Sequence, residues 1–101
     1  MGQLTTYQNY IDGQWSDSVS GETYTITNPA HKSQVLGRFQ RSNNEDAVRA
    51  IEAARNALDG WASTPAPQRA AILFKALQLM EERGDELARS ITTEEGKPIG
   101  D

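Results

Sequence analysis

The sequence predicts a protein of the α/β class, α+β within these 101 residues, in which short strands come first and three helices follow. β-favouring residues and turn signals alternate up to about residue 41, whereas apolar residues recur at helical spacing between about residues 43 and 96. No internal repeat and no linker rich in glycine and serine divides the chain. We therefore expect a single segment over residues 1–101, with strands in about 8–41 and helices in about 43–96.

The first predicted element is a β-hairpin. The stretch Asn9–Trp15 places Asp12-Gly13 between β-favouring residues, and this pair tolerates the positive φ angles of a tight two-residue turn. A polar turn over 16–21 follows it. The next stretch, Glu22–Thr27, alternates apolar and threonine side chains, which predicts a half-buried strand.

Asn28-Pro29 ends that strand because proline cannot donate to a strand ladder. A polar loop over Ala30–Gln34 is expected to lead into a second short strand, Val35–Gln40. The strands are predicted to form one small sheet. Two or three such strands are unstable in water unless another layer covers their apolar face.

Ser42–Glu45 has the pattern of a capping box, which predicts the start of the first helix at Ser42. Gly60 is its expected exit. The predicted apolar stripe consists of Ala47, Ile51, Ala54, Leu58 and Trp61. The opposite face, expected in water, carries Arg49, Glu52, Arg55 and Asn56.

Thr64–Pro67 predicts the start of the second helix, because the fixed φ of proline suits the first helical position. This helix is expected to run to about Glu82 and to end at Arg83-Gly84. Its apolar surface is wide, which is typical of a helix covered on more than one side. Asp85 is expected to cap a third helix that closes at Gly96, with proline just beyond.

Composition excludes several function classes. Ten basic residues do not cluster and are outnumbered by fourteen acidic ones, for a net charge of −4, so a nucleic-acid partner is not expected. With no cysteine there is no disulfide and no thiolate metal site. No apolar run is long enough to span a bilayer, and the first residues lack the apolar core of a signal peptide. Met1-Gly2 could begin a myristoylation motif, but the surrounding residues form a pattern that is common by chance. We expect a cytoplasmic location and no membrane partner.

No residue type that supports catalysis occurs in a recognisable arrangement, and no glycine-rich phosphate loop is present. His31 is expected to be a solvated loop residue. Adjacent Glu94 and Glu95 point about 100° apart on a helix, which favours an exposed charged face over an acid and base pair. Trp15 and Trp61 are expected to be core anchors.

Several motifs occur in a fixed order and together carry a family resemblance. They are Tyr10–Trp15, Asn28–Ala30, Glu45-Asp46 before Ala50–Arg55, Trp61, Pro65–Leu73, Glu81–Ala88 and Thr93–Pro98. This ordered set resembles the amino-terminal segment of the NAD(P)-dependent aldehyde dehydrogenase superfamily. The stretch around Asn28–Ala30 and Gly37–Ser42 is most similar to the branch that acts on semialdehydes such as 2-oxoglutarate semialdehyde.

The resemblance implies that a complete member, several times longer, oxidises an aldehyde to a carboxylate with NAD or NADP. In the family a cysteine thiolate attacks the carbonyl, hydride passes to the nicotinamide, and a glutamate-activated water releases the acyl group. Those residues and the cofactor-binding glycines lie downstream in the family, so no catalytic or cofactor-binding residue is assigned here, and this chain alone is expected to be inactive. Its partners would be the rest of the fold, which is usually homo-oligomeric, and an aldehyde substrate.

The resemblance also implies that this segment is the outer part of the cofactor-binding domain, packed on a sheet encoded later. In many members the two residues before the Asn-Pro pair lend backbone carbonyls to a monovalent cation, which by position would be Ile26 and Thr27. Carbonyl oxygens suit a hard cation, but a full shell needs further oxygens from later segments. For this chain alone, ordinary strand residues with ladder hydrogen bonds are the favoured interpretation.

Two interpretations without catalysis remain open. The chain would be a free-standing helical module that binds a partner through the apolar face of its second helix, or a regulatory remnant that caps a full-length paralogue. A self-sufficient module should bury Leu77, Met80 and Ile91 with its own atoms.

Overall fold

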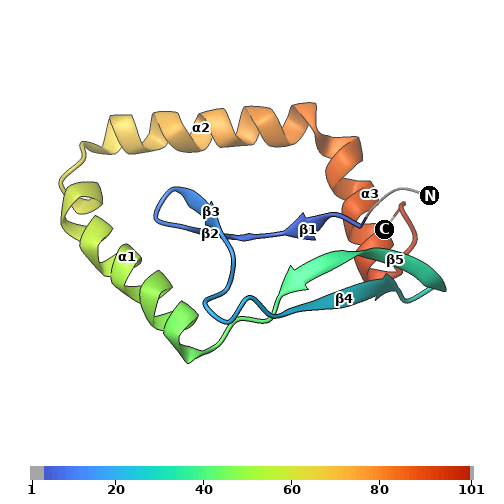
Figure 1. Ribbon diagram of the computed structural model, residues 1–101. Coiled ribbons are helices and arrows are strands. Elements are labelled where there is room, and N and C mark those ends of the chain that lie inside the picture. The colour runs from blue at the N-terminus through green and yellow to red at the C-terminus, as the bar shows by residue number, and fades with distance from the viewer. Residues whose placement is uncertain (1–3, 101) are drawn as a thin grey trace.

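The computed structural model describes residues 4–100, so Met1 and Gly2 lie outside the described range. Within this range short strands precede three helices, as the sequence predicts (Figure 1). The strands are β1 (Thr6–Tyr7), β2 (Asn9–Ile11), β3 (Gln14–Ser16), β4 (Thr23–Asn28) and β5 (His31–Gln40). The helices are α1 (Asn44–Ala62), α2 (Ala66–Glu82) and α3 (Gly84–Glu95).

The predicted hairpin is present as β2 and β3, which pair antiparallel. Its turn places Asp12 at φ 54° and Gly13 at φ 74°, the left-handed region that this residue pair tolerates. Tyr10 and Trp15 face each other across the strands with ring centroids 4.8 Å apart. The expectation that Trp15 and Trp61 are core anchors is wrong for this chain, because 67% and 43% of their surfaces are exposed.

The expectation of one sheet is also wrong. The β2–β3 hairpin stands apart as a two-stranded sheet, and a second sheet has the order β1-β5-β4. In this second sheet β4 and β5 are antiparallel, while β1 pairs parallel with β5 at Tyr7↔Phe39. A turn dipeptide predicts which residues pair within one hairpin. It does not predict pairing between strands far apart in the sequence, so the sequence analysis missed β1, which pairs with β5.

Gly37 is the residue that lets β1 approach β5. A Cβ atom there would lie 2.6 Å from the ring of Tyr7 and 2.8 Å from the backbone oxygen of Thr5. Only glycine permits this separation of two backbones. The amide of Arg38 then donates to the same Thr5 oxygen at 2.9 Å, and Tyr7 stacks on Phe39 with centroids 5.0 Å apart.

β5 is longer than predicted. The expected loop Ala30–Gln34 is a two-residue turn at Pro29-Ala30 followed by strand from His31 onward. The β4–β5 register shifts near this turn, since Asn28 pairs with His31 whereas the preceding residue pairs with Val35. Polar residues that indicated a loop therefore sit in a bulged part of the strand, where an extra residue needs no ladder partner.

The capping box of α1 lies one residue later than predicted. The cap is Asn43, not Ser42, and its partner is Asp46, not Glu45. The Asn43 side chain accepts from the Asp46 amide at 3.2 Å, and Asp46 accepts from the Asn43 amide at 3.0 Å. Asp46 is 3% exposed, because its other oxygen also accepts from the amide of Val19 at 2.9 Å. That contact from the 17–22 loop selects Asp46 over Glu45.

Two other helix boundaries differ from the prediction. α1 continues through Gly60 to Ala62, because the hydroxyls of Ser63 and Thr64 bond the carbonyls of the last turn, including that of Gly60 at 2.8 Å from Thr64. Asp85 does not cap α3, because Arg83 alone separates α2 from α3 and serves as the boundary residue of both.

The predicted ends of the second and third helices are confirmed, whereas the expected cover of the second helix is absent among residues 4–100. α2 ends at Glu82, and α3 closes on Gly96 in the left-handed conformation, with φ 89°. Near the start of α2, Arg69 donates from Nε to the Thr64 carbonyl at 3.0 Å. This bond links the first turn of α2 to the segment that connects α1 and α2.

The helices form an open frame around the strands (Figure 1). α1 and α3 make two sides, and α2 crosses between them away from the β4–β5 pair. Among residues 4–100 no hydrophobic side chain is buried. The radius of gyration is 17.3 Å, whereas a compact domain of about 100 residues has about 13 Å. Leu77, Met80 and Ile91 are 50%, 59% and 51% exposed, so they are not shielded by this chain's own atoms.

The shifted capping box can be tested with two neighbouring substitutions. Asn43→Ala should destabilise α1 by about 1 kcal/mol, because the Asp46 amide at the helix start loses its side-chain acceptor. Far-UV circular dichroism should show a loss of helix. The control Ser42→Ala removes only an exposed contact to Asn9 and should leave the helix signal unchanged. Equal losses in both variants would contradict the structure.

A second prediction follows from the absence of buried hydrophobic side chains among residues 4–100. The isolated chain should show helical circular dichroism but no cooperative thermal transition, because an apolar layer that would lock its elements together is absent. It should bind a hydrophobic dye and self-associate in size-exclusion chromatography. A sharp melt from a monodisperse monomer is the result that would count against this description.

Candidate functional site

The two residues singled out by the sequence, Ile26 and Thr27, are consecutive in β4. They pair with Gly37 and Val35 of β5, which is the ordinary ladder expected for this chain alone. The register shifts on both sides of Thr27, however, so the ladder is irregular at this position. An irregular ladder is where backbone groups become available for other partners.

The turn that follows these residues is held by Asn28. Its side-chain oxygen accepts from the Ala30 amide at 2.9 Å, and its amide donates to the Gln34 side chain at 3.0 Å. Asn28 is 8% exposed, one of the few buried side chains described. Because these bonds fix both sides of Pro29, the end of β4 has a defined direction.

The same turn abuts the end of α3. A Cβ atom on Gly96 would lie 3.5 Å from the ring of Pro29 and 3.8 Å from the Ala30 amide. The positive φ of Gly96 ends α3 and turns the chain beside the β4–β5 turn. The carbonyls of Ile26 and Thr27 therefore belong to β4, whose C-terminal end leads into a turn that packs against the C-terminus of α3.

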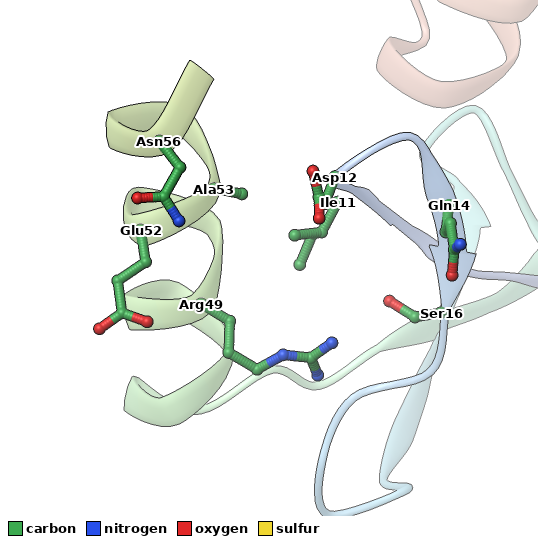
Figure 2. A pocket seen from close by; sticks show the side chains of 8 residues that line it. All are labelled: Ile11, Asp12, Gln14, Ser16, Arg49, Glu52, Ala53 and Asn56. Atoms are coloured by element: carbon green, nitrogen blue, oxygen red, sulfur yellow. The ribbon is translucent and has the colours of Figure 1, made fainter. Parts of the chain in front are cut away.

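A second feature is an open polar pocket of about 340 Å³ between the hairpin and α1 (Figure 2). Arg49 reaches from α1 across it toward Ser16, and Ala53 points at the hairpin (Figure 2). The hydroxyl of Ser16 is buried and has no hydrogen-bond partner among the described atoms. The lining residues are Ile11, Asp12, Gln14, Ser16, Arg49, Glu52, Ala53 and Asn56.

The sequence analysis missed this pocket, although alternation along the hairpin puts Ile11, Gln14 and Ser16 on one face. The charged face of α1 predicted to meet water is exposed, as expected, and borders the pocket. The apolar stripe with Ile51 and Leu58 lies about 180° around the helix from that face. The hairpin therefore covers none of it.

Neither feature contains a cysteine thiol, and the two acidic side chains of the pocket, Asp12 and Glu52, lie on different elements. The chain has no cysteine, and within residues 4–100 no three His, Cys, Asp or Glu residues are grouped to hold a metal ion. His31 is exposed, as expected, but begins β5 instead of lying in a loop. Glu94 and Glu95 are exposed on the last turn of α3. In the part of the chain described, no helix is long and apolar enough to cross a membrane.

Comparison with known proteins identifies the family of this chain. Residues 15–101 match the aldehyde dehydrogenase family. The chain is 47% identical over 90 residues to the alpha-ketoglutarate semialdehyde dehydrogenase of Haloferax volcanii, and 48% identical over 94 residues to malonate-semialdehyde dehydrogenase 1 of Geobacillus thermodenitrificans. These matches cover 89% and 93% of this chain and 19% of each relative.

A solved structure has the same fold over nearly the whole chain. The NAD-dependent aldehyde dehydrogenase from Sinorhizobium meliloti superposes with a TM-score of 0.89 at 33% identity, covering 96% of this chain and 20% of that one. The chain thus spans about a fifth of the length of the proteins it matches. By its sequence match and its fold, it belongs to the aldehyde dehydrogenase family.

Proposed function

We propose that this chain is the amino-terminal part of an oxidoreductase that oxidises an aldehyde to a carboxylate with NAD or NADP. The observation that carries the proposal is a family match from residue 15 to residue 101 by a chain in which no hydrophobic side chain is buried among residues 4–100. Since the chain has no cysteine, it lacks the thiol that the family's chemistry needs. Its role is structural, as the outer part of the cofactor-binding domain of a homo-oligomeric cytoplasmic enzyme.

The substrate we propose is a semialdehyde, an aldehyde that also carries a carboxylate. The two relatives named above are a ketoglutarate-semialdehyde and a malonate-semialdehyde dehydrogenase, at 47% and 48% identity. Because the two sequence identities are nearly equal, they support semialdehydes as a substrate class and do not favour one particular semialdehyde. The Sinorhizobium meliloti protein is NAD-dependent, which supports a nicotinamide cofactor.

A free-standing interaction module is less well supported. Such a module needs its own core, yet α2 has no buried residue and Leu73 and Phe74 are 66% and 70% exposed. An isolated amphipathic helix draws most of its stability from packing. A regulatory remnant is compatible with the exposed faces and differs from our proposal in its partner, a full-length paralogue.

We also propose that the backbone carbonyls of Ile26 and Thr27 contribute to a monovalent cation site in the complete protein. The irregular β4–β5 ladder at Thr27 and the rigid turn at Asn28 support it. Carbonyl oxygens are suitable donors for a hard cation, and two of them leave most of its shell to later segments.

A chimaera tests the proposed function. Residues 15–101, which match the family, would replace the corresponding segment of the Haloferax volcanii relative, and semialdehyde-dependent reduction of NAD and NADP would be followed by absorbance. We expect kcat/KM within about tenfold of the parent, a barrier change of about 1.4 kcal/mol, because these residues lie outside the chemistry. The isolated chain should show no reduction. The control is the chimaera with the parent's nucleophilic cysteine replaced by serine, which should be inactive.

Activity of the isolated chain, or a folded but inactive chimaera, would contradict the proposal. Folding is judged separately by circular dichroism and size-exclusion chromatography. This separation keeps a failure to fold distinct from a failure of function.

The cation site predicts an ion-specific effect on stability. The melting temperature of the chimaera should rise when choline chloride is replaced by sodium or potassium chloride at the same concentration, because a cation that binds only the folded state stabilises it. The circular dichroism of the isolated chain should be the same in choline, sodium and potassium chloride, since two carbonyl oxygens are too few for a cation site. An equal response to choline and the alkali cations would contradict the assignment of Ile26 and Thr27.

A further inference from the structure

The sequence contains two Asp-Gly pairs, and the structure places them in different backbone conformations. Asp12-Gly13 forms the turn of the β2–β3 hairpin, whereas Asp59-Gly60 lies near the end of α1. All four residues are exposed. Exposure therefore does not distinguish the two pairs, and the backbone does.

An aspartate that precedes glycine reacts slowly with its own backbone. The glycine nitrogen attacks the side-chain carboxyl carbon of the aspartate. The nitrogen loses its proton, the bond from that carbon to its hydroxyl breaks, and one water leaves as a five-membered succinimide ring forms. Water then opens the ring at either carbonyl, which regenerates aspartate or gives isoaspartate. Glycine favours ring closure because no side chain stands beside the attacking nitrogen.

The peptide plane between Asp12 and Gly13 is free to make the rotation that ring closure requires. Neither the Asp12 carbonyl nor the Gly13 amide takes part in the turn and loop hydrogen bonds of residues 4–100. Two-residue hairpin loops occur as type I′ or type II′ turns, which differ in the orientation of this plane. A positive φ at Asp12 suits both types, and glycine at the second position permits either sign of φ. The plane can thus rotate while the flanking pair Ile11↔Gln14 stays in place.

The corresponding plane between Asp59 and Gly60 is held on both sides. The Asp59 carbonyl accepts from the Ser63 amide at 3.0 Å and from the Ser63 hydroxyl at 2.8 Å. The Gly60 amide lies inside α1, where each amide donates to the carbonyl four residues earlier. Rotation of this plane breaks these bonds, so ring closure at Asp59 requires local opening of the last turns of α1.

We propose that Asp12 is a modification site, at which the chain forms isoaspartate through a succinimide, and that α1 protects Asp59 from the same reaction. Isoaspartate adds one atom to the backbone and carries its carboxylate directly on Cα. Because a two-residue turn fixes the register of its hairpin, the added atom loosens the β2–β3 pairing. It also moves the Asp12 carboxylate at the edge of the pocket that Arg49 enters (Figure 2). This inference goes beyond the proposed function and does not depend on it.

The test follows both Asp-Gly pairs in one sample of the 101-residue chain, aged in a mildly acidic buffer. Trypsin places the pairs in different peptides, residues 1–32 and 56–69. Isoaspartate is located by fragmentation in the mass spectrometer and by resistance to a protease that cleaves before aspartate. It should accumulate at Asp12 at least about fivefold faster than at Asp59, because closure at Asp59 must await helix opening. In concentrated urea the two rates should become equal, since both aspartates precede glycine.

A substitution at Gly13 tests the chemical route. Gly13→Asn places a side chain beside the attacking nitrogen, and isoaspartate at Asp12 should fall to the level found at Asp59 in buffer. The turn should persist, because asparagine tolerates positive φ and a Cβ atom at Gly13 meets no atom within 4 Å. The matched control Gly60→Asn should leave the rate at Asp12 unchanged.

Three results would overturn the inference. If Asp12 is unmodified in buffer while both pairs react in urea, the hairpin protects its own turn. If both pairs react equally in buffer, α1 gives Asp59 no protection. If Gly13→Asn leaves the rate at Asp12 unchanged, the reaction does not pass through the succinimide. None of these results bears on the proposed function, which the chimaera tests separately.

Discussion

An amphipathic helix is stable when its apolar face lies against another layer, and residues 4–100 contain no such layer for α1, α2 or α3. The two small sheets are too narrow to serve, and one of them sits beside the polar side of α1. This constraint explains the open frame, the radius of gyration of 17.3 Å and the absence of a buried hydrophobic side chain in the part described. The same constraint leaves apolar side chains of all three helices exposed within residues 4–100.

Polar contacts give the segment its shape where apolar packing is missing. Asp46 ties the 17–22 loop to the start of α1 through Val19, and Gln40 accepts from the Ser18 amide at 2.7 Å. Asn28 fixes the turn that meets Gly96 at the end of α3. Buried hydrogen bonds of this kind are directional, so they set the angles at which elements leave one another even though each adds little net stability. The helices are thereby held with their apolar faces open.

The sequence predicted many features that local chemistry decides. The Asp12-Gly13 turn, the stop at Pro29 and the left-handed Gly96 follow from the φ angles that these residues permit. Predictions failed where a distant partner decided. Asp46 was missed because Val19 selects it, and β1 was missed because Gly37, thirty residues later, makes room for Tyr7. The polar pocket was missed because Ser16 and Arg49 line the same pocket only through the placement of the hairpin beside α1.

By itself the sequence determined that strands precede three helices, the approximate lengths of those helices, the family and the absence of a cysteine, because each depends on residue type and short-range spacing. Only the tertiary structure decided that the strands divide into two sheets, which residue caps α1, and which side of each helix is left uncovered. Those outcomes depend on contacts between residues far apart in sequence, which local periodicity does not encode.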